Sequence, residues 1–125
     1  NDDQKCTFRT TELYLTKAET QVQLNNIADA KSTVLAFVKN RYTPTGYVDL
    51  EIAINAMNAT DLTNFILEER QREFAVEGHR WFDLRRTSQK QIVHTINGTD
   101  YTLIKNDPRY TIIYPANARL NNPNL

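Results

Sequence analysis

Apolar residues recur at helical spacing through the first part of the chain. Leu15, Ala18 and Val22 stand at positions i, i+3 and i+7, which predicts an amphipathic helix from about residue 12 to residue 25. Asn25-Asn26 breaks this pattern, and a second helix is predicted from about residue 28 to residue 42. Because the break is short, the two helices are expected to form an antiparallel helical hairpin.

The next segment repeats the helical pattern after a polar interruption. Thr43-Pro44-Thr45-Gly46 has the composition of a loop, and a short helix is expected to begin at Asp49. Thr60-Asp61 is then expected to cap a longer helix that Gly78 interrupts, with Trp81–Leu84 forming a further helical turn or two.

The pattern changes to a strand-like one after residue 90. Ile92–Ile96 and Tyr101–Ile104 are rich in β-branched and aromatic residues and flank Asn97-Gly98. This dipeptide tolerates positive φ at both centres of a type I′ turn, so the segment predicts a β-hairpin. The remaining tail is rich in proline and asparagine and is expected to run extended, with one strand at 111–114.

These elements predict a mainly α fold in a single unit spanning residues 1–125. Antiparallel helical hairpins of tetratricopeptide-like type are expected over 9–88, followed by the β-hairpin over 91–104 and the extended tail over 105–125. The helical pairs show no consensus repeat, and two pairs are fewer than the usual three of a free-standing solenoid. The helices are therefore expected to need a neighbour that covers them.

Composition and charge exclude some classes of function. Fifteen basic and fifteen acidic residues cancel, and no long run of one sign is present. The chain therefore lacks the positive field that a nucleic-acid-binding surface needs. Its apolar stretches are far shorter than the roughly 20 residues that span a bilayer.

The densest charged segment lies between residues 68 and 86. On a helix, Glu68 and Glu69 face Arg72, and Arg70 faces Glu73, at spacings of three or four residues. The same spacing recurs farther along the segment. We expect a structural ion network formed by Glu69, Arg70, Arg72, Glu73, Glu77, Arg80, Asp83 and Arg86.

A catalytic or metal-binding role for these residues is less consistent with their spacing. Glu69, Glu73 and Glu77 share one helical row, whereas a glycosidase needs two acids that face each other across a cleft. His79 and His94 have no cysteine or histidine at ligand spacing, so no metal site and no cofactor is expected. His79 is expected to pack beside Trp81.

The aromatic residues carry two further expectations. Trp81 could serve as a sugar platform if it were exposed, but it is expected instead to anchor the helix junction to the core, because large aromatic side chains dominate core burial. The tyrosines of loops and strands are better placed for contact with a ligand, although no spacing singles one out: these are Tyr42, Tyr47, Tyr101, Tyr110 and Tyr114.

The charged segment also resembles a family signature. The pattern Glu69-Arg70-x-x-Glu73-Phe74-x-x-Glu77-Gly78-x-Arg80-x-x-Asp83-Leu84-x-Arg86 is similar to one near the C-terminus of SusD/RagB proteins. Weaker similarities surround it in the same order, at Arg9–Glu19, Leu35–Arg41, Tyr114-Pro115 and Asn121–Leu125. The chain thus resembles the C-terminal portion of a larger SusD-like protein.

The resemblance implies a function as well as a fold. Such proteins are lipoproteins on the outer-membrane surface of Bacteroidota, where they capture glycans or other nutrients for a SusC-like TonB-dependent transporter. The resemblance implies that the lipid anchor lies at the N-terminus of the parent protein, outside the segment that this chain is expected to represent. The implied role in polysaccharide utilization is binding rather than catalysis. The alternative is a protein-interaction scaffold whose helical hairpins dock a partner and which binds no glycan itself.

Overall fold

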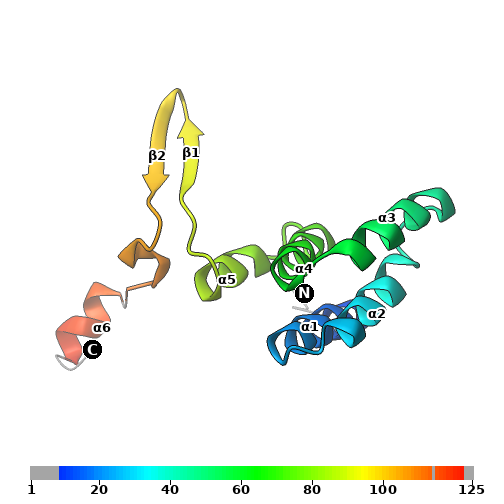
Figure 1. Cartoon of the computed structure of the whole chain (residues 1–125). Helices are drawn as coiled ribbons and strands as arrows, with labels where there is room; N and C mark the ends of the chain where they lie inside the picture. The colour runs from blue at the N-terminus through cyan, green and yellow to red at the C-terminus, as the bar shows by residue number, and fades with distance from the viewer. Residues whose placement is uncertain (1–8, 114, 123–125) are drawn as a thin grey trace, which may run out of the picture. The chain divides into compact units, whose positions relative to one another are not determined.

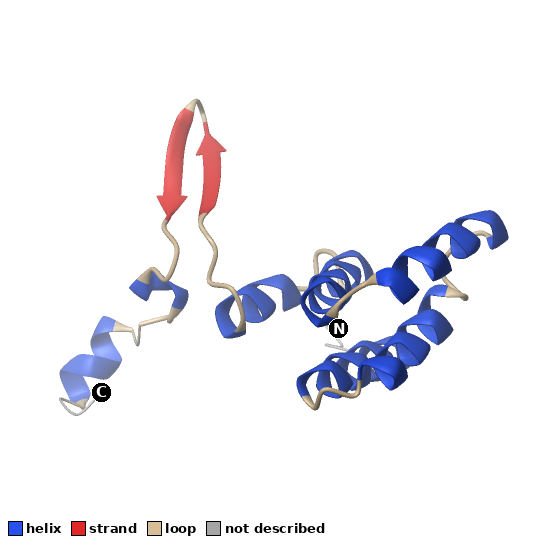
Figure 2. Ribbon diagram, in the orientation of Figure 1, coloured by secondary structure: helices blue, strands red, loops and turns tan. Residues whose placement is uncertain are grey.

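The structure is a computed structural model that describes residues 9–113 and 115–122. It divides into two compact units, one ending at His79 and the other beginning at Arg80. The first unit consists of helices, and the second contains a β-hairpin between short helices (Figures 1 and 2). The predicted mainly α fold with a C-terminal β-hairpin is confirmed.

The first unit is built from four helices. They are α1 (Thr10–Gln23), α2 (Ile27–Val38), α3 (Pro44–Ala56) and α4 (Ala59–Glu73). Asn25 adopts a φ of 60° in the short turn between α1 and α2, a conformation that asparagine tolerates better than most residues. The turn lets α2 pack on α1, which confirms the predicted helical hairpin.

One apolar core joins these helices. The buried residues come from every helix of the unit and from the end of α4: Leu15, Ala18, Val22, Ala30, Val34, Phe37, Val38, Ile54, Leu62, Ile66 and Phe74. Helix α4 packs on α1, and α3 packs on α2. Each large aliphatic side chain removed from water in this way stabilises the fold by about 1.5–3 kcal/mol. The stripe of Leu15, Ala18 and Val22 predicted from the sequence lies in this core.

The starts of α3 and α4 differ from the prediction. Thr43–Gly46 was expected to form a loop before a helix at Asp49, but α3 already begins at Pro44. Thr43 caps it by accepting a hydrogen bond from the Gly46 amide at 3.2 Å. Proline suits the first helical position because its missing N–H has no partner there in any case. Thr43 to Gly46, which were expected to form a loop, therefore form the N-cap and the first turn of α3.

Helix α4 also begins earlier than predicted. Its N-cap is Asn58, whose side chain accepts a hydrogen bond from the Asp61 amide at 2.9 Å, rather than Thr60-Asp61. The helix ends at Glu73, and the chain leaves it through Val76 and Gly78, which have φ values of 62° and 82°. The helix was expected to continue to Gly78, but it already ends at Glu73, and α5 (His79–Arg86) is a separate helix that begins directly after Gly78.

The second unit is organised around the predicted hairpin. Strands β1 (Ile92–Ile96) and β2 (Thr99–Leu103) pair antiparallel, with Ile96 opposite Thr99. Asn97 and Gly98 both have positive φ, 50° and 77°, as a type I′ turn requires. This two-residue turn fixes the register of the whole hairpin.

The tail is less extended than predicted. A short 3-10 helix, η1 (Pro108–Tyr110), follows the hairpin, and α6 (Ala116–Asn121) follows later. Asp107 caps η1 by accepting a hydrogen bond from the Arg109 amide at 2.9 Å. The strand expected at 111–114 is not formed by residues 111–113, and Tyr114 lies outside the described residues.

Candidate binding site

A cluster of charged residues gathers around the C-terminal half of α4. Glu69 is only 3% exposed and accepts a hydrogen bond from the Tyr42 hydroxyl at 2.6 Å. Arg72 donates to Glu69 and also to Glu68, the latter at 3.2 Å. Burial, and then the hydrogen bond to Glu69, raises the pKa of the Tyr42 phenol. The phenol therefore stays a donor to the carboxylate across the physiological range.

Arginines from two other segments complete this cluster. Arg41, just after α2, donates to Glu73 at 2.7 Å. Arg9, just before α1, pairs with Glu77 and approaches Glu73 at 3.9 Å. The sequence predicted partners along the helix, whereas these ion pairs tie α4 to the ends of α1 and α2.

Arg70 has a different environment from the other arginines of α4. It is only 7% exposed, it donates to the Thr16 hydroxyl at 3.3 Å, and its guanidinium lies 5.5 Å from the centre of the Phe74 ring. The Phe74 ring also stacks on the His79 ring, with 4.7 Å between the ring centres. Arg70 therefore connects α4 to α1 through packing as well as through hydrogen bonding.

The charged cluster surrounds a small cavity of about 180 Å³. Its lining residues are Arg41, Tyr42, Glu69, Arg72 and Glu73. Both carboxylates are engaged by arginine or tyrosine donors, so their hydrogen-bonding capacity is spent largely on the protein itself. This geometry suits a tertiary contact better than a pair of free catalytic acids.

The remaining members of the expected ion network lie on α5. Asp83 is 2% exposed and accepts from Arg86 at 2.7 Å, the i, i+3 pair that the spacing suggested. The Asp83 backbone carbonyl also accepts from the Thr87 hydroxyl at 2.6 Å. Arg80 is half-buried on the first turn of the same helix. The eight predicted residues are therefore divided between the two units.

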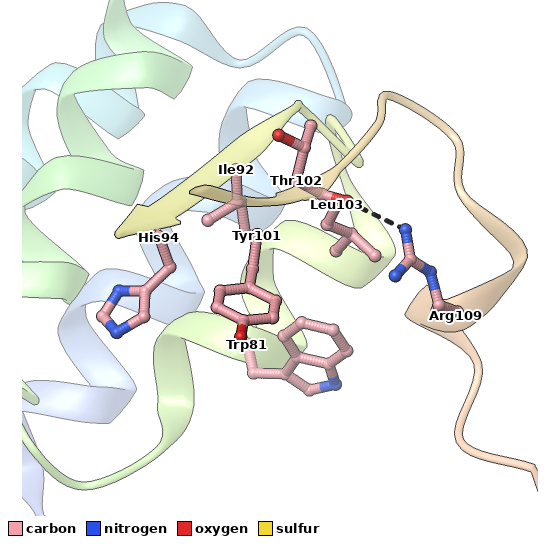
Figure 3. Close-up of a pocket in the computed structure, with 7 residues that line it drawn as sticks. All are labelled: Trp81, Ile92, His94, Tyr101, Thr102, Leu103 and Arg109. Atoms are coloured by element: carbon pink, nitrogen blue, oxygen red, sulfur yellow. Dashed lines mark hydrogen bonds between the residues drawn. The ribbon is translucent and has the colours of Figure 1, made fainter. Parts of the chain in front are cut away.

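A larger pocket, of about 300 Å³, lies in the second unit (Figure 3). Its lining residues are Trp81 of α5, Arg109 of η1, and Ile92, His94, Tyr101, Thr102 and Leu103 of the hairpin. The hairpin register places His94 directly opposite Tyr101, and Ile92 opposite Leu103. Directly opposed residues of a hairpin share one face, so these four side chains line the pocket together.

Two contacts hold the walls of this pocket. Tyr110 is 1% exposed, and its ring stacks on Trp81 with centres 5.1 Å apart and planes inclined by 19°. Arg109 donates to the Thr102 carbonyl at 2.9 Å and to the Asp107 carboxylate at 2.7 Å. The hydrogen bonds from Arg109 hold the pKa of the Asp107 carboxyl well below its ordinary range. Trp81 is only partly buried and is not among the core residues, so the expected anchoring to the core is not seen: it packs on Tyr110 and lines the pocket.

The tyrosines named in the sequence analysis lie in different environments, and Tyr47, which was expected in a loop or strand, lies on helix α3. Tyr110 is buried rather than available for contact, while Tyr101 is 59% exposed and Tyr42 is half-buried against Glu69. The role of Arg109 and the pairing of His94 with Tyr101 escaped the sequence analysis. The second of these was accessible, because a two-residue turn at Asn97-Gly98 already implies that pairing.

Two further properties of the described residues bear on the site. Residues 9–113 and 115–122 hold no group of three or more histidine, cysteine, aspartate or glutamate side chains that could bind a metal ion. No helix in these same ranges is long and apolar enough to cross a membrane.

Comparison with known proteins completes the description. The SusD family model matches residues 1–124 of the chain. The chain is also 33% identical, over 93 residues, to SusD-like protein P38 of Formosa agariphila. That alignment covers 73% of this chain but only 18% of the relative.

Proposed function

The chain belongs to the SusD family, and on that premise we propose that the protein containing it captures glycans or other nutrients at the outer-membrane surface. The match of the family model over residues 1–124 is the observation that carries this proposal. The proposed activity is reversible binding without chemistry. The geometry supports it, since the buried carboxylates Glu69 and Asp83 are each paired with an arginine.

We propose further that the chain forms the C-terminal portion of a longer SusD-like lipoprotein. The chain spans about a fifth of the length of the curated relative that it matches. A lipid anchor in another part of the protein would hold it at the cell surface. A SusC-like TonB-dependent transporter would receive the nutrient.

We propose that the charged cluster stabilises the helical unit. Arg9, Arg41 and Arg72 reach the carboxylates of α4 from three different positions along the chain. The arginine of each pair is at least 39% exposed, so one pair alone contributes modestly and the stabilisation depends on several pairs together. The cluster keeps the helical unit in one geometry, so that ligand and partner surfaces elsewhere are presented correctly.

A second proposal, for the helical unit alone, is that it docks a protein partner. Leu13 and Tyr14 of α1 are 52% and 41% exposed, and Val48 and Ile52 of α3 are 53% and 67% exposed. Val48 and Ile52 are four residues apart and share a face of α3. Exposed apolar side chains on two helices favour a scaffold role for this part of the protein.

A pair of measurements tests these proposals. The complete encoded protein is titrated calorimetrically with soluble polysaccharides, and it is used as bait for detergent-solubilised outer-membrane proteins. Saturable heat with a polysaccharide, together with capture of a TonB-dependent transporter, is the expected result. Capture of the transporter without heat from any polysaccharide would favour the scaffold proposal instead.

A further inference from the structure

The pocket of the C-terminal unit has an apolar floor held in place by packing. Trp81, Ile92 and Leu103 line it, and Ile92 and Leu103 are cross-strand partners. The buried ring of Tyr110 stacks on Trp81 and so sets the orientation of the indole. A rigid aromatic and aliphatic surface of this kind binds the apolar face of a ring at low entropic cost.

Polar groups with unused hydrogen-bonding capacity surround this floor. Neither the Tyr101 hydroxyl nor the His94 ring has a hydrogen-bond partner within the part of the chain that the structure describes. Arg109 uses Nε and Nη2 for Asp107 and Thr102, and its Nη1 is not engaged by any described residue. Figure 3 shows His94 and Tyr101 extending from the hairpin on the side where Trp81 lies.

The charge of the pocket is compensated within the protein. Arg109 is the one lysine or arginine among the lining residues, and the Asp107 carboxylate lies 2.7 Å from its guanidinium. The pocket therefore offers aromatic surface and hydrogen-bond donors, and the arginine that lines it is already paired with a carboxylate. This combination favours a neutral ligand over an anionic one.

We propose that this pocket binds one sugar ring of a neutral glycan, with the ring stacked on aromatic surface and its hydroxyls bonded to Tyr101, His94 and Arg109. The volume of about 300 Å³ is at the lower end of the range for small-ligand sites, which suits one ring rather than a long segment. The inference rests on the proposed function and assigns a ligand site to the C-terminal unit.

The test compares two exposed tyrosines in the complete encoded protein. Tyr101→Ala removes a pocket wall, whereas Tyr14→Ala removes a tyrosine of α1 that is outside the pocket and 41% exposed. Both variants and the unaltered protein are titrated calorimetrically with short neutral oligosaccharides of glucose, mannose and galactose, and with oligogalacturonate. Tyr101→Ala is expected to weaken binding about tenfold, through lost stacking and one lost hydrogen bond, while Tyr14→Ala leaves it unchanged.

Each other outcome has a definite meaning. Equal affinity of Tyr101→Ala and the unaltered protein would overturn the pocket proposal and leave the proposed function standing. A failure of the unaltered protein to bind any oligosaccharide or polysaccharide would count against the proposed function itself. Tighter binding of oligogalacturonate, sensitive to Tyr101→Ala, would refute the neutral ligand class.

Discussion

At the scale of single residues, the structure distinguishes charges that hold the fold from charges that solvate it. Glu69, Arg70 and Asp83 are buried and contact other elements or neighbouring turns, whereas Glu68 is an exposed partner of Arg72. Exposed pairs contribute at most about 1 kcal/mol, but loss of one buried partner costs several times more. The side chains of the family signature thus differ widely in their expected effect on stability.

Arg70→Ala is expected to destabilise the helical unit by about 3 kcal/mol, because a buried guanidinium and its packing on Phe74 are lost together. Lys31→Ala is the matched control, since Lys31 makes an exposed hydrogen bond of 2.8 Å to the Asn55 carbonyl. Urea unfolding followed by far-ultraviolet circular dichroism measures both. Equal stabilities of the two variants would contradict the role of Arg70 in holding α4 against α1.

Asp107 is expected to make the C-terminal unit sensitive to acid. Its hydrogen bonds with Arg109 lower the pKa of the carboxyl in the folded chain. Above the ordinary pKa of 3.8 both states are ionised and the stabilisation is complete. As the pH falls below that value, the unfolded state takes up the proton first, so the stabilisation is progressively lost.

The variant Asp107→Asn tests this pH dependence. It should be less stable than the unaltered protein at pH 7, and the difference should shrink as the pH is lowered from 4 towards 2. Trp81 is the single tryptophan of the chain and lies in the same unit, so its fluorescence follows the unfolding. A difference in stability that does not change with pH would contradict the assigned role of Asp107.

At the scale of elements, the hairpin depends on its turn. Asn97 and Gly98 both have positive φ, and a Cβ added at Gly98 would meet nothing within 4 Å. Substitution there is therefore a test of backbone conformation without a steric clash. The same turn positions His94 opposite Tyr101, so it also shapes the proposed sugar pocket.

Gly98→Ala is expected to destabilise the C-terminal unit by about 1 kcal/mol, because an alanine pays for the left-handed backbone that glycine adopts freely. Asn97→Gly serves as the control in the same turn and should change stability little. Thermal unfolding followed by Trp81 fluorescence measures both variants. A Gly98→Ala variant as stable as the control would indicate that the turn adopts another conformation in solution.

The sequence predicted an element correctly where a single local feature, such as apolar spacing or a turn dipeptide, determined its structure. The stripe of Leu15, Ala18 and Val22 and the Asn97-Gly98 turn each allowed a single interpretation, and both predictions hold in the structure. Thr43–Gly46 was ambiguous, since proline and glycine suit both a loop and the first turn of a capped helix. The long-range pairs of Arg9 and Arg41 with α4 could not be read from spacing, because they depend on how helices pack.

At the scale of the whole molecule, the chain consists of a helical unit stabilised by ion pairs and a C-terminal unit that carries the proposed ligand pocket. Family membership is the reason for which nutrient capture is proposed for the protein that contains both units. Nothing in this arrangement requires the ligand to react. The protein's proposed role is to hold a glycan and release it unchanged.

Recovery of the ligand after binding shows directly whether the protein leaves the glycan unchanged. The complete encoded protein is saturated with a neutral polysaccharide that it binds, and the sugar is then released by dilution and its chain length measured. The account predicts saturable, reversible binding with the polysaccharide recovered at its original length. Shortened or modified chains in the released sugar, absent from a control incubated without protein, would contradict it.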